Sequence, residues 1–145
     1  MKQAIIIGAS SGIGWELGVQ LAAKGYQLGL MARREDCLKK LADSLPGTHF
    51  VQTTDVSQAE QAQEELTALI ERMGDVELII VNSGVGSAEK QLDWVIEREM
   101  IDVNVRGFAA MSMVAMNHFV KRGSGHLAGV SSAAAHFSGG LTLTY

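Results

Sequence analysis

The sequence contains little that would mark a secreted, membrane-spanning or nucleic-acid-binding protein. Among its 145 residues are one cysteine, Cys37, and one proline, and aromatic residues make up 6%. A single cysteine excludes an internal disulfide, which fits a reducing cytoplasm, and we expect Cys37 to be buried filler on a helix. No apolar run reaches the length of a membrane span. The net charge of −4 argues against a nucleic-acid-binding surface.

Two further absences narrow the possible functions. The first predicted strand starts within a few residues of Met1, which leaves no room for a signal peptide. The histidines do not show the spacing of metal ligands, so we expect surface or packing roles for them; they are His49, His118, His126 and His136. The sequence therefore predicts a cytoplasmic protein with no metal site, no membrane contact and no nucleic-acid partner.

What the chain does contain is a regular alternation of apolar strands and amphipathic helices. Hydrophobic residues make up 47% of the chain and charged residues 19%, so we expect one globular domain over residues 1–145. Short apolar runs predict five strands: Gln3–Ile7, Tyr26–Ala32, His49–Thr53, Glu77–Val81 and Leu127–Ser131. Helices are expected at Gly12–Lys24 and Glu35–Ser44, from a Ser57-x-x-Glu60 capping box to Gly74, and from about Leu92 to Arg122 with a break near Glu99.

This alternation predicts parallel βαβ units with right-handed crossovers. The expected fold is α/β, a doubly wound Rossmann-type sheet with strand order 3-2-1-4-5. In such sheets ligands bind at the carboxyl ends of the strands. The polar residues that interrupt the apolar pattern fall at that edge, among them Arg33, Asp55, Asn82 and Ser132.

The most informative stretch is the glycine-rich turn between the first strand and the first helix. Gly8, Gly12 and Gly14 surround two serines, Ser10 and Ser11. A strand that turns directly into a helix directs free backbone N–H groups and the positive helix end at one point, which suits a phosphate. Taken alone, the turn fits a tight connection without a ligand equally well.

Five motifs in order make this sequence similar to classical short-chain dehydrogenases/reductases. They are the glycine turn, Asp55-Val56, Asn82-Ser83-Gly84, Asn104, and Ser132 followed by Tyr145 after 13 residues. Two positions depart from the family pattern, because Ile7 stands where threonine is usual and Ser83 where alanine is usual. The likeness runs from residue 2 to residue 145.

The resemblance implies a nicotinamide dinucleotide cofactor. Its binding residues would be Gly8, Ser10, Ser11, Gly12, Ile13, Gly14, Arg33, Arg34, Asp55, Val56, Asn82, Ser83 and Gly84. Arginine instead of an acid after the second strand favours a 2′-phosphate, hence NADP(H) over NAD(H), with Arg33 ahead of Arg34. The simpler alternatives are solvated charges at both arginines, a helix-start charge at Asp55 and an Asx turn at Asn82.

The resemblance also implies hydride transfer between nicotinamide and a carbonyl or alcohol substrate. Tyr145 would protonate the oxygen, Ser132 would hydrogen-bond it, and Asn104 would hold a water. The family's lysine, four residues after the tyrosine, falls at position 149, past the end of this sequence, and so do its last helix and strands. We therefore expect a truncated form with little or no turnover.

Two rival functions remain open: a non-catalytic dinucleotide-binding or regulatory protein, and a fragment that binds nothing. The resemblance further implies a homo-oligomer, because in the family the helix that contains Met111, Met113 and Met116 commonly packs on its twin. The strand at Leu127–Val130 would be an open edge, which predicts self-association or low stability.

Overall fold

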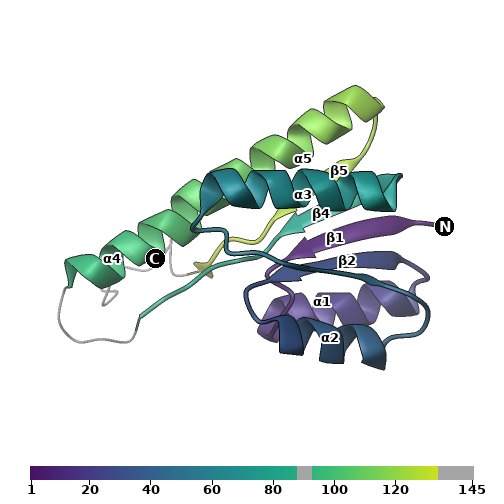
Figure 1. Cartoon of the computed structure of the whole chain (residues 1–145), viewed down its shortest axis with the longest axis horizontal. Coiled ribbons are helices and arrows are strands. Elements are labelled where there is room, and N and C mark those ends of the chain that lie inside the picture. The colour runs from purple at the N-terminus through teal and green to yellow at the C-terminus, as the bar shows by residue number, and fades with distance from the viewer. Residues whose placement is uncertain (88–92, 134–145) are drawn as a thin grey trace.

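The computed structural model describes residues 1–87 and 93–133. Strands and helices alternate through most of this length (Figure 1). The elements are β1 (Gln3–Ile7), α1 (Gly12–Ala23), β2 (Gln27–Ala32), α2 (Glu35–Ser44), β3 (Phe50–Thr53), α3 (Ala59–Met73), β4 (Val76–Val81), α4 (Trp94–Met100), the π-helical segment η1 (Ile101–Gly107), α5 (Phe108–Arg122) and β5 (His126–Gly129).

The strands form one parallel sheet in the order β3-β2-β1-β4-β5. This confirms the predicted fold class and strand order. The order reverses beside β1, since β2 lies on one side of it and β4 on the other. Two successive crossovers therefore leave a crevice at the carboxyl end of β1, where such folds bind ligands.

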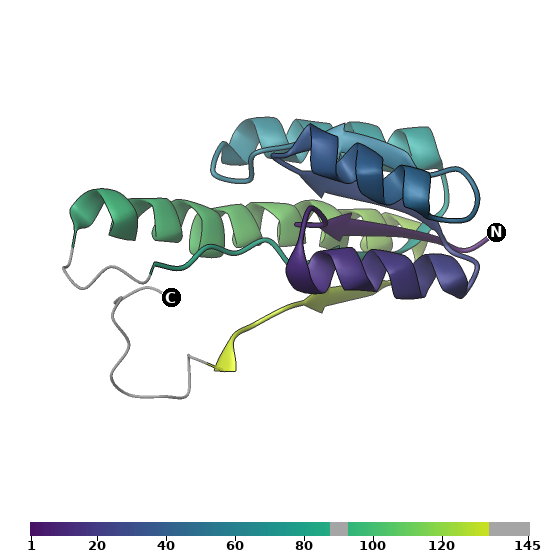
Figure 2. The same ribbon diagram turned by 90° about the horizontal axis from the view of Figure 1, so that it is seen from below.

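Helices cover both faces of the sheet, with α1 and α2 on one face and α3 and α5 on the other (Figures 1 and 2). β1 supplies both layers because its side chains alternate: Ile5 and Ile7 pack toward α3 and α5, while Ala4 and Ile6 pack toward α1 and α2. These four side chains are at most 1% exposed. β1 is thus the rigid centre from which the crevice extends.

Most elements lie within one residue of their predicted bounds, and two segments depart further from the prediction. β5 is shorter than the expected Leu127–Ser131, since only one backbone bond, from Val130 N to Val81 O at 2.9 Å, continues it past Gly129. The long helix has no break near Glu99. Instead it continues, and its hydrogen bonding changes to the π pattern at Ile101–Gly107. π turns of this kind are rare and cluster at functional sites.

The predicted capping box is wrong. α3 begins at Ala59, and its N-cap, Gln58, makes no side-chain cap bond. The backbone N–H and the hydroxyl of Ser57 both donate to Asp55 Oδ1, at 3.0 and 2.7 Å. The nearby carboxylate captures Ser57 in a local turn, while Glu60 pairs elsewhere, so neither capping bond forms.

None of the helices that the structure describes is long and apolar enough to cross a lipid bilayer.

Candidate dinucleotide-binding site

The turn after β1 is held in place by its neighbours on both sides. The backbone N–H groups of Gly8 and Ala9 donate to Met31 O on β2, at 2.7 and 3.1 Å. On the other side, Asn82 Nδ2 donates to Gly8 O at 3.0 Å. Asn82 therefore does more than close a local turn, because it ties the end of β4 to the turn after β1.

Two glycines are required by this close packing. Gly8 has φ +93°, and a Cβ there would lie 2.7 Å from Ser83 N. A Cβ on Gly14 would lie 2.0 Å from Gly8 O and 2.7 Å from Asn82 Nδ2. Only glycine lets the first turn of α1 come this near to β1 and β4.

The start of α1 is open to a ligand. Its N-cap, Ser11, has extended backbone and makes no side-chain cap hydrogen bond. The first N–H groups of a helix have no partner within the helix, so here they face the crevice with the positive helix end. The arrangement has the donors and the charge that a phosphate needs.

Two cavities meet beside this turn, and they share the lining residues Asn82, Ser83 and Gly84. The first has a volume of about 330 Å³. Besides the shared residues it is lined by Ile7, Gly8, Ser10, Ser11, Met31, Ala32, Arg33, Arg34, Thr54, Asp55, Val56, Val85 and Val103. The second measures about 590 Å³ and is lined by Ile13, Asn104, Val105, Phe108, Gly129, Val130, Ser131, Ser132 and Ala133.

The two arginines after β2 extend to different sides of the first cavity. Arg34 Nη2 donates to the hydroxyls of Ser10 and Ser11, at 3.0 and 2.9 Å. Arg33 Nη1 lies 3.7 Å from Glu99 Oε1 on α4, and both side chains are more than half exposed. The arginine that contacts the glycine turn is thus Arg34, and the sequence-based preference for Arg33 as the partner of a 2′-phosphate stays a prediction.

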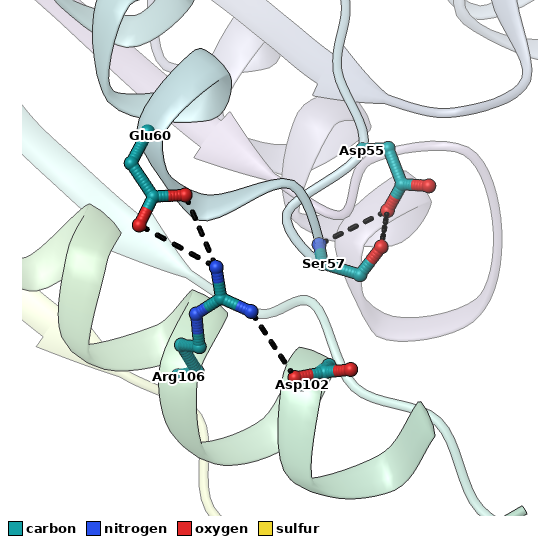
Figure 3. A network of polar contacts seen from close by, with 5 residues as sticks. All are labelled: Asp55, Ser57, Glu60, Asp102 and Arg106. Carbon is teal, nitrogen blue, oxygen red and sulfur yellow. Dashed lines mark hydrogen bonds and ion pairs between the residues drawn. The ribbon is translucent and has the colours of Figure 1, made fainter. Parts of the chain in front are cut away.

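Asp55 and Val56 follow β3 and line the first cavity. Asp55 uses Oδ1 to hold Ser57, as Figure 3 shows, which fixes the carboxylate at the cavity wall. Val56 is 7% exposed and packs in the core beneath it. This pair therefore presents one rigid carboxylate and one apolar side chain to a flat ring.

Asn104 lies in the π-helical segment and holds the loop after β4. Its Nδ2 donates to Val85 O, and its Oδ1 accepts from Val85 N, both at 2.8 Å. These two hydrogen bonds fix the loop where the two cavities meet. Asn104 itself lines the second cavity, while Val103, next to it, lines the first.

Two ion pairs of Arg106 hold the π-helical segment on its solvent-exposed side. Arg106 Nη2 pairs with Glu60 Oε2 at the start of α3, at 3.1 Å, and its Nη1 pairs with Asp102 Oδ1 at 3.3 Å (Figure 3). On the inner side, a Cβ on Gly107 would lie 2.6 Å from Val56 O. The segment is therefore pressed against the loop after β3, which aligns Val103 with the first cavity.

The predicted catalytic residues are only partly brought together. Ser132 lines the second cavity together with Asn104. Tyr145 lies outside the described residues, so the Ser132–Tyr145 pairing stays a prediction. Within the described ranges, 1–87 and 93–133, no three histidine, cysteine, aspartate or glutamate side chains are placed to hold a metal ion.

Sequence reasoning missed two residues of the site, Thr54 and Glu99, and did not show that the hydroxyl of the predicted binding residue Ser83 is buried. The hydroxyls of Thr54 and Ser83 are buried without a hydrogen-bond partner among the described residues, and both side chains line the first cavity. Glu99 was treated only as a position where the helix breaks, yet it pairs with Arg33. Ser83 is among the cofactor-binding residues predicted from the sequence, whereas no pattern in the sequence singles out Thr54 or the pairing of Glu99.

Comparison with known proteins places these features in a family. The family model for short chain dehydrogenases matches residues 2–145. An uncharacterized oxidoreductase from Listeria innocua is 36% identical over 141 residues, which cover 92% of this chain and 56% of that protein. The chain thus spans little more than half the length of the curated relatives it matches.

Two solved structures of moderate identity support the same assignment. An alcohol dehydrogenase from the archaeon Thermococcus sibiricus, complexed with 5-hydroxy-NADP, is 35% identical with a TM-score of 0.78, covering 86% of this chain and 55% of that one. A short-chain type dehydrogenase/reductase from Mycobacterium marinum is 26% identical with a TM-score of 0.88, covering 95% and 58%.

Proposed function

We propose that this chain, which belongs to the short-chain dehydrogenase/reductase family, binds NADP(H) in an oxidoreductase that acts on a carbonyl or alcohol. One observation carries the proposal. The uncapped start of α1 and the two arginines after β2 open onto the same cavity. A helix N-terminus suits the bridging phosphates, and a guanidinium suits a 2′-phosphate.

The residues present fit such a cofactor. Gly8 and Gly14 shape the turn into a phosphate cradle, because only glycine avoids a clash with the ends of β1 and β4 at these two positions. Asp55 and Val56 would take the adenine, and Asn82 and Gly84 the adjoining ribose, since all four line the first cavity. The second cavity, shared at Asn82–Gly84, offers room for the nicotinamide half and for a substrate.

The preference for NADP(H) rests on charge at the end of β2. Within the part of the chain that the structure describes, the side-chain hydrogen bonds of Arg34 go to neutral hydroxyls, those of Ser10 and Ser11. Its guanidinium charge is not neutralised by these partners and can pair with an anion. The two hydroxyls can turn to donate to the same phosphate. The complex of the Thermococcus sibiricus relative with 5-hydroxy-NADP supports this choice.

In catalysis the residues of this chain would have separate tasks. The bound nicotinamide supplies or accepts the hydride. Ser132 would donate a hydrogen bond to the substrate oxygen in the second cavity, and Tyr145 would give that oxygen its proton. Asn104 would keep the loop at Val85 fixed, so that the two cavities stay aligned.

We also propose that the protein self-associates through α5. Met113, Met116 and Val120 are 61%, 49% and 73% exposed, and they lie on one side of this helix with Ala109. Val105, one turn earlier, is 56% exposed and extends the stripe. Sedimentation of the wild-type chain and of a Met113→Ser/Met116→Ser variant tests this, with dissociation expected for the variant.

A binding experiment tests the cofactor proposal. NADPH and NADH are titrated against the wild-type chain, Arg34→Ala, and Arg98→Ala as a control for charge loss on α4. Arg34→Ala should weaken NADPH binding about tenfold, because a charge-assisted contact is lost, and should change NADH binding far less. Equal losses for both nucleotides, or none, would refute the assignment of the 2′-phosphate.

A further inference from the structure

We propose that Glu99 on α4 sets the selectivity between NADP(H) and NAD(H), by competing with the 2′-phosphate for Arg33. This inference rests on the proposed function and concerns the same cavity. Glu99 belongs to none of the sequence motifs of the site. It enters through the ion pair with Arg33, whose Nη1 lies 3.7 Å from Glu99 Oε1.

The two arginines at this cavity are held by partners of different charge. Arg34 bonds two neutral hydroxyls, those of Ser10 and Ser11. Arg33 faces a carboxylate. A 2′-phosphate that reaches Arg34 gains extra donors, whereas one that reaches Arg33 must first displace Glu99. The pair with Glu99 therefore lowers the affinity for a phosphorylated ribose.

The placement of Glu99 adds a second effect in the same direction. Arg33 lines the first cavity, and so does Val103, which lies one turn after Glu99 along the same continuous helix. A carboxylate this close to a lining residue repels an anionic phosphate even after Arg33 has turned away. A ribose without the 2′-phosphate carries no charge there and does not experience this repulsion.

The size of the effect follows from exposure. The side chains of Arg33 and Glu99 are 55% and 57% exposed, so solvent screens their interaction. Glu99→Gln should therefore tighten NADPH binding by about threefold to fivefold, the range of a surface ion pair. NADH binding should change by less than about twofold. The variant keeps the shape of the side chain and removes only its charge.

A double-mutant cycle separates this role from a general charge effect. NADPH and NADH are titrated against wild type, Glu99→Gln, Arg33→Ala and the double variant, with Glu71→Gln as the control. Glu71 is an exposed acid in the last turns of α3, at the opposite end from the cavity. Glu71→Gln should leave both affinities unchanged, and the gain from Glu99→Gln should be smaller when Arg33 is absent, because only the direct repulsion between Glu99 and the phosphate then remains.

The outcomes distinguish this inference from the function on which it rests. A wild-type chain that binds NADPH while Glu99→Gln binds it no more tightly overturns the role of Glu99 alone. Weaker NADH binding by Glu99→Gln also overturns it, because Glu99 would then be accepting from a ribose hydroxyl. A wild-type chain that binds neither nucleotide removes the proposed function and this inference together.

Discussion

The two cavities at the carboxyl edge of the sheet differ in charge and in how they are held. The first contains both arginines and Asp55, and strand-end backbone bonds fix its floor. The second is larger, and its described lining has no charged side chain. Its polar groups are amides and hydroxyls, such as those of Asn104 and Ser132.

This difference suggests that recognition and chemistry are separated in the fold. Charge in the first cavity suits the phosphates of a nucleotide, because a phosphate at the cavity rim stays partly hydrated and loses little solvation free energy on binding. Neutral hydrogen-bonding groups in the second suit a carbonyl oxygen, whose charge develops only during reaction. The residues of the first cavity come from the first 103 positions, whereas the second also needs residues 129–133.

The largest expected effect is on the cradle itself. Gly14→Ala should destabilise the fold by about 3 kcal/mol and abolish NADPH binding, because its Cβ overlaps Gly8 O. Gly84→Ala is the control for folding stability alone, since its Cβ would lie 3.5 Å from Asn104 Oδ1, an ordinary contact. Urea denaturation of both variants measures the difference. A stable Gly14→Ala protein that still binds NADPH would contradict the described cradle.

A smaller effect, on ligand affinity, should distinguish the roles of the two cavities. Asn104→Ala removes both bonds to Val85 and should weaken binding of whole NADPH by about fivefold to tenfold. Adenosine 2′,5′-bisphosphate occupies only the first cavity in our account, so its affinity should stay within about twofold. Calorimetric titration measures both ligands, and Asn117→Ala on the exposed side of α5 is the control. Equal losses for both ligands would mean that the cavities act as one unit.

The smallest effect should be on folding stability, through an ion pair far from both cavities, and it should leave ligand binding unchanged. Arg122, 2.8 Å from Asp75, holds the pKa of that carboxyl below its usual range, through a hydrogen bond and through charge. The stabilisation is therefore present above the carboxyl's unfolded pKa and is lost as the pH falls through the lower folded value.

Asp75→Asn should accordingly unfold at slightly lower urea than wild type at neutral pH, with the difference fading from about pH 4 downward. Both proteins should bind NADPH equally. A difference in midpoint that persists at low pH would indicate that shape at this position, and not charge, provides the stabilisation.

The sheet could be predicted from sequence because each strand is a short apolar run bounded by glycine or polar residues. β1 and β4 have their expected ends at Ile7 and Val81, and the order of strands follows from the crossover rule. The site could be located because polar residues follow each strand. Both inferences use information that is local in sequence.

The sequence could not predict features for which a side chain chooses among several hydrogen-bond or ion-pair partners, some distant in sequence and some equally close. Ser57 could cap α3 or bond Asp55, and the pattern did not reveal which acceptor was nearer. The contacts of Arg33 and Arg34 could not be read from the sequence, because the two are adjacent and only the packed structure brings one to Glu99 on α4 and the other to the glycine turn. The π-helical segment likewise depends on contacts with α3 and the loop after β3.

Hydrogen exchange on the wild-type chain, with and without NADPH, tests the central claim most directly. Our account predicts new protection at the amides of residues 9–15, in the glycine turn and the start of α1, and at those of 54–56 and 82–85, which line the first cavity. The amides of residues 115–122, near the far end of α5, should exchange unchanged. Protection confined to other segments, or none at saturating NADPH, would contradict the assignment of the glycine turn as a dinucleotide site.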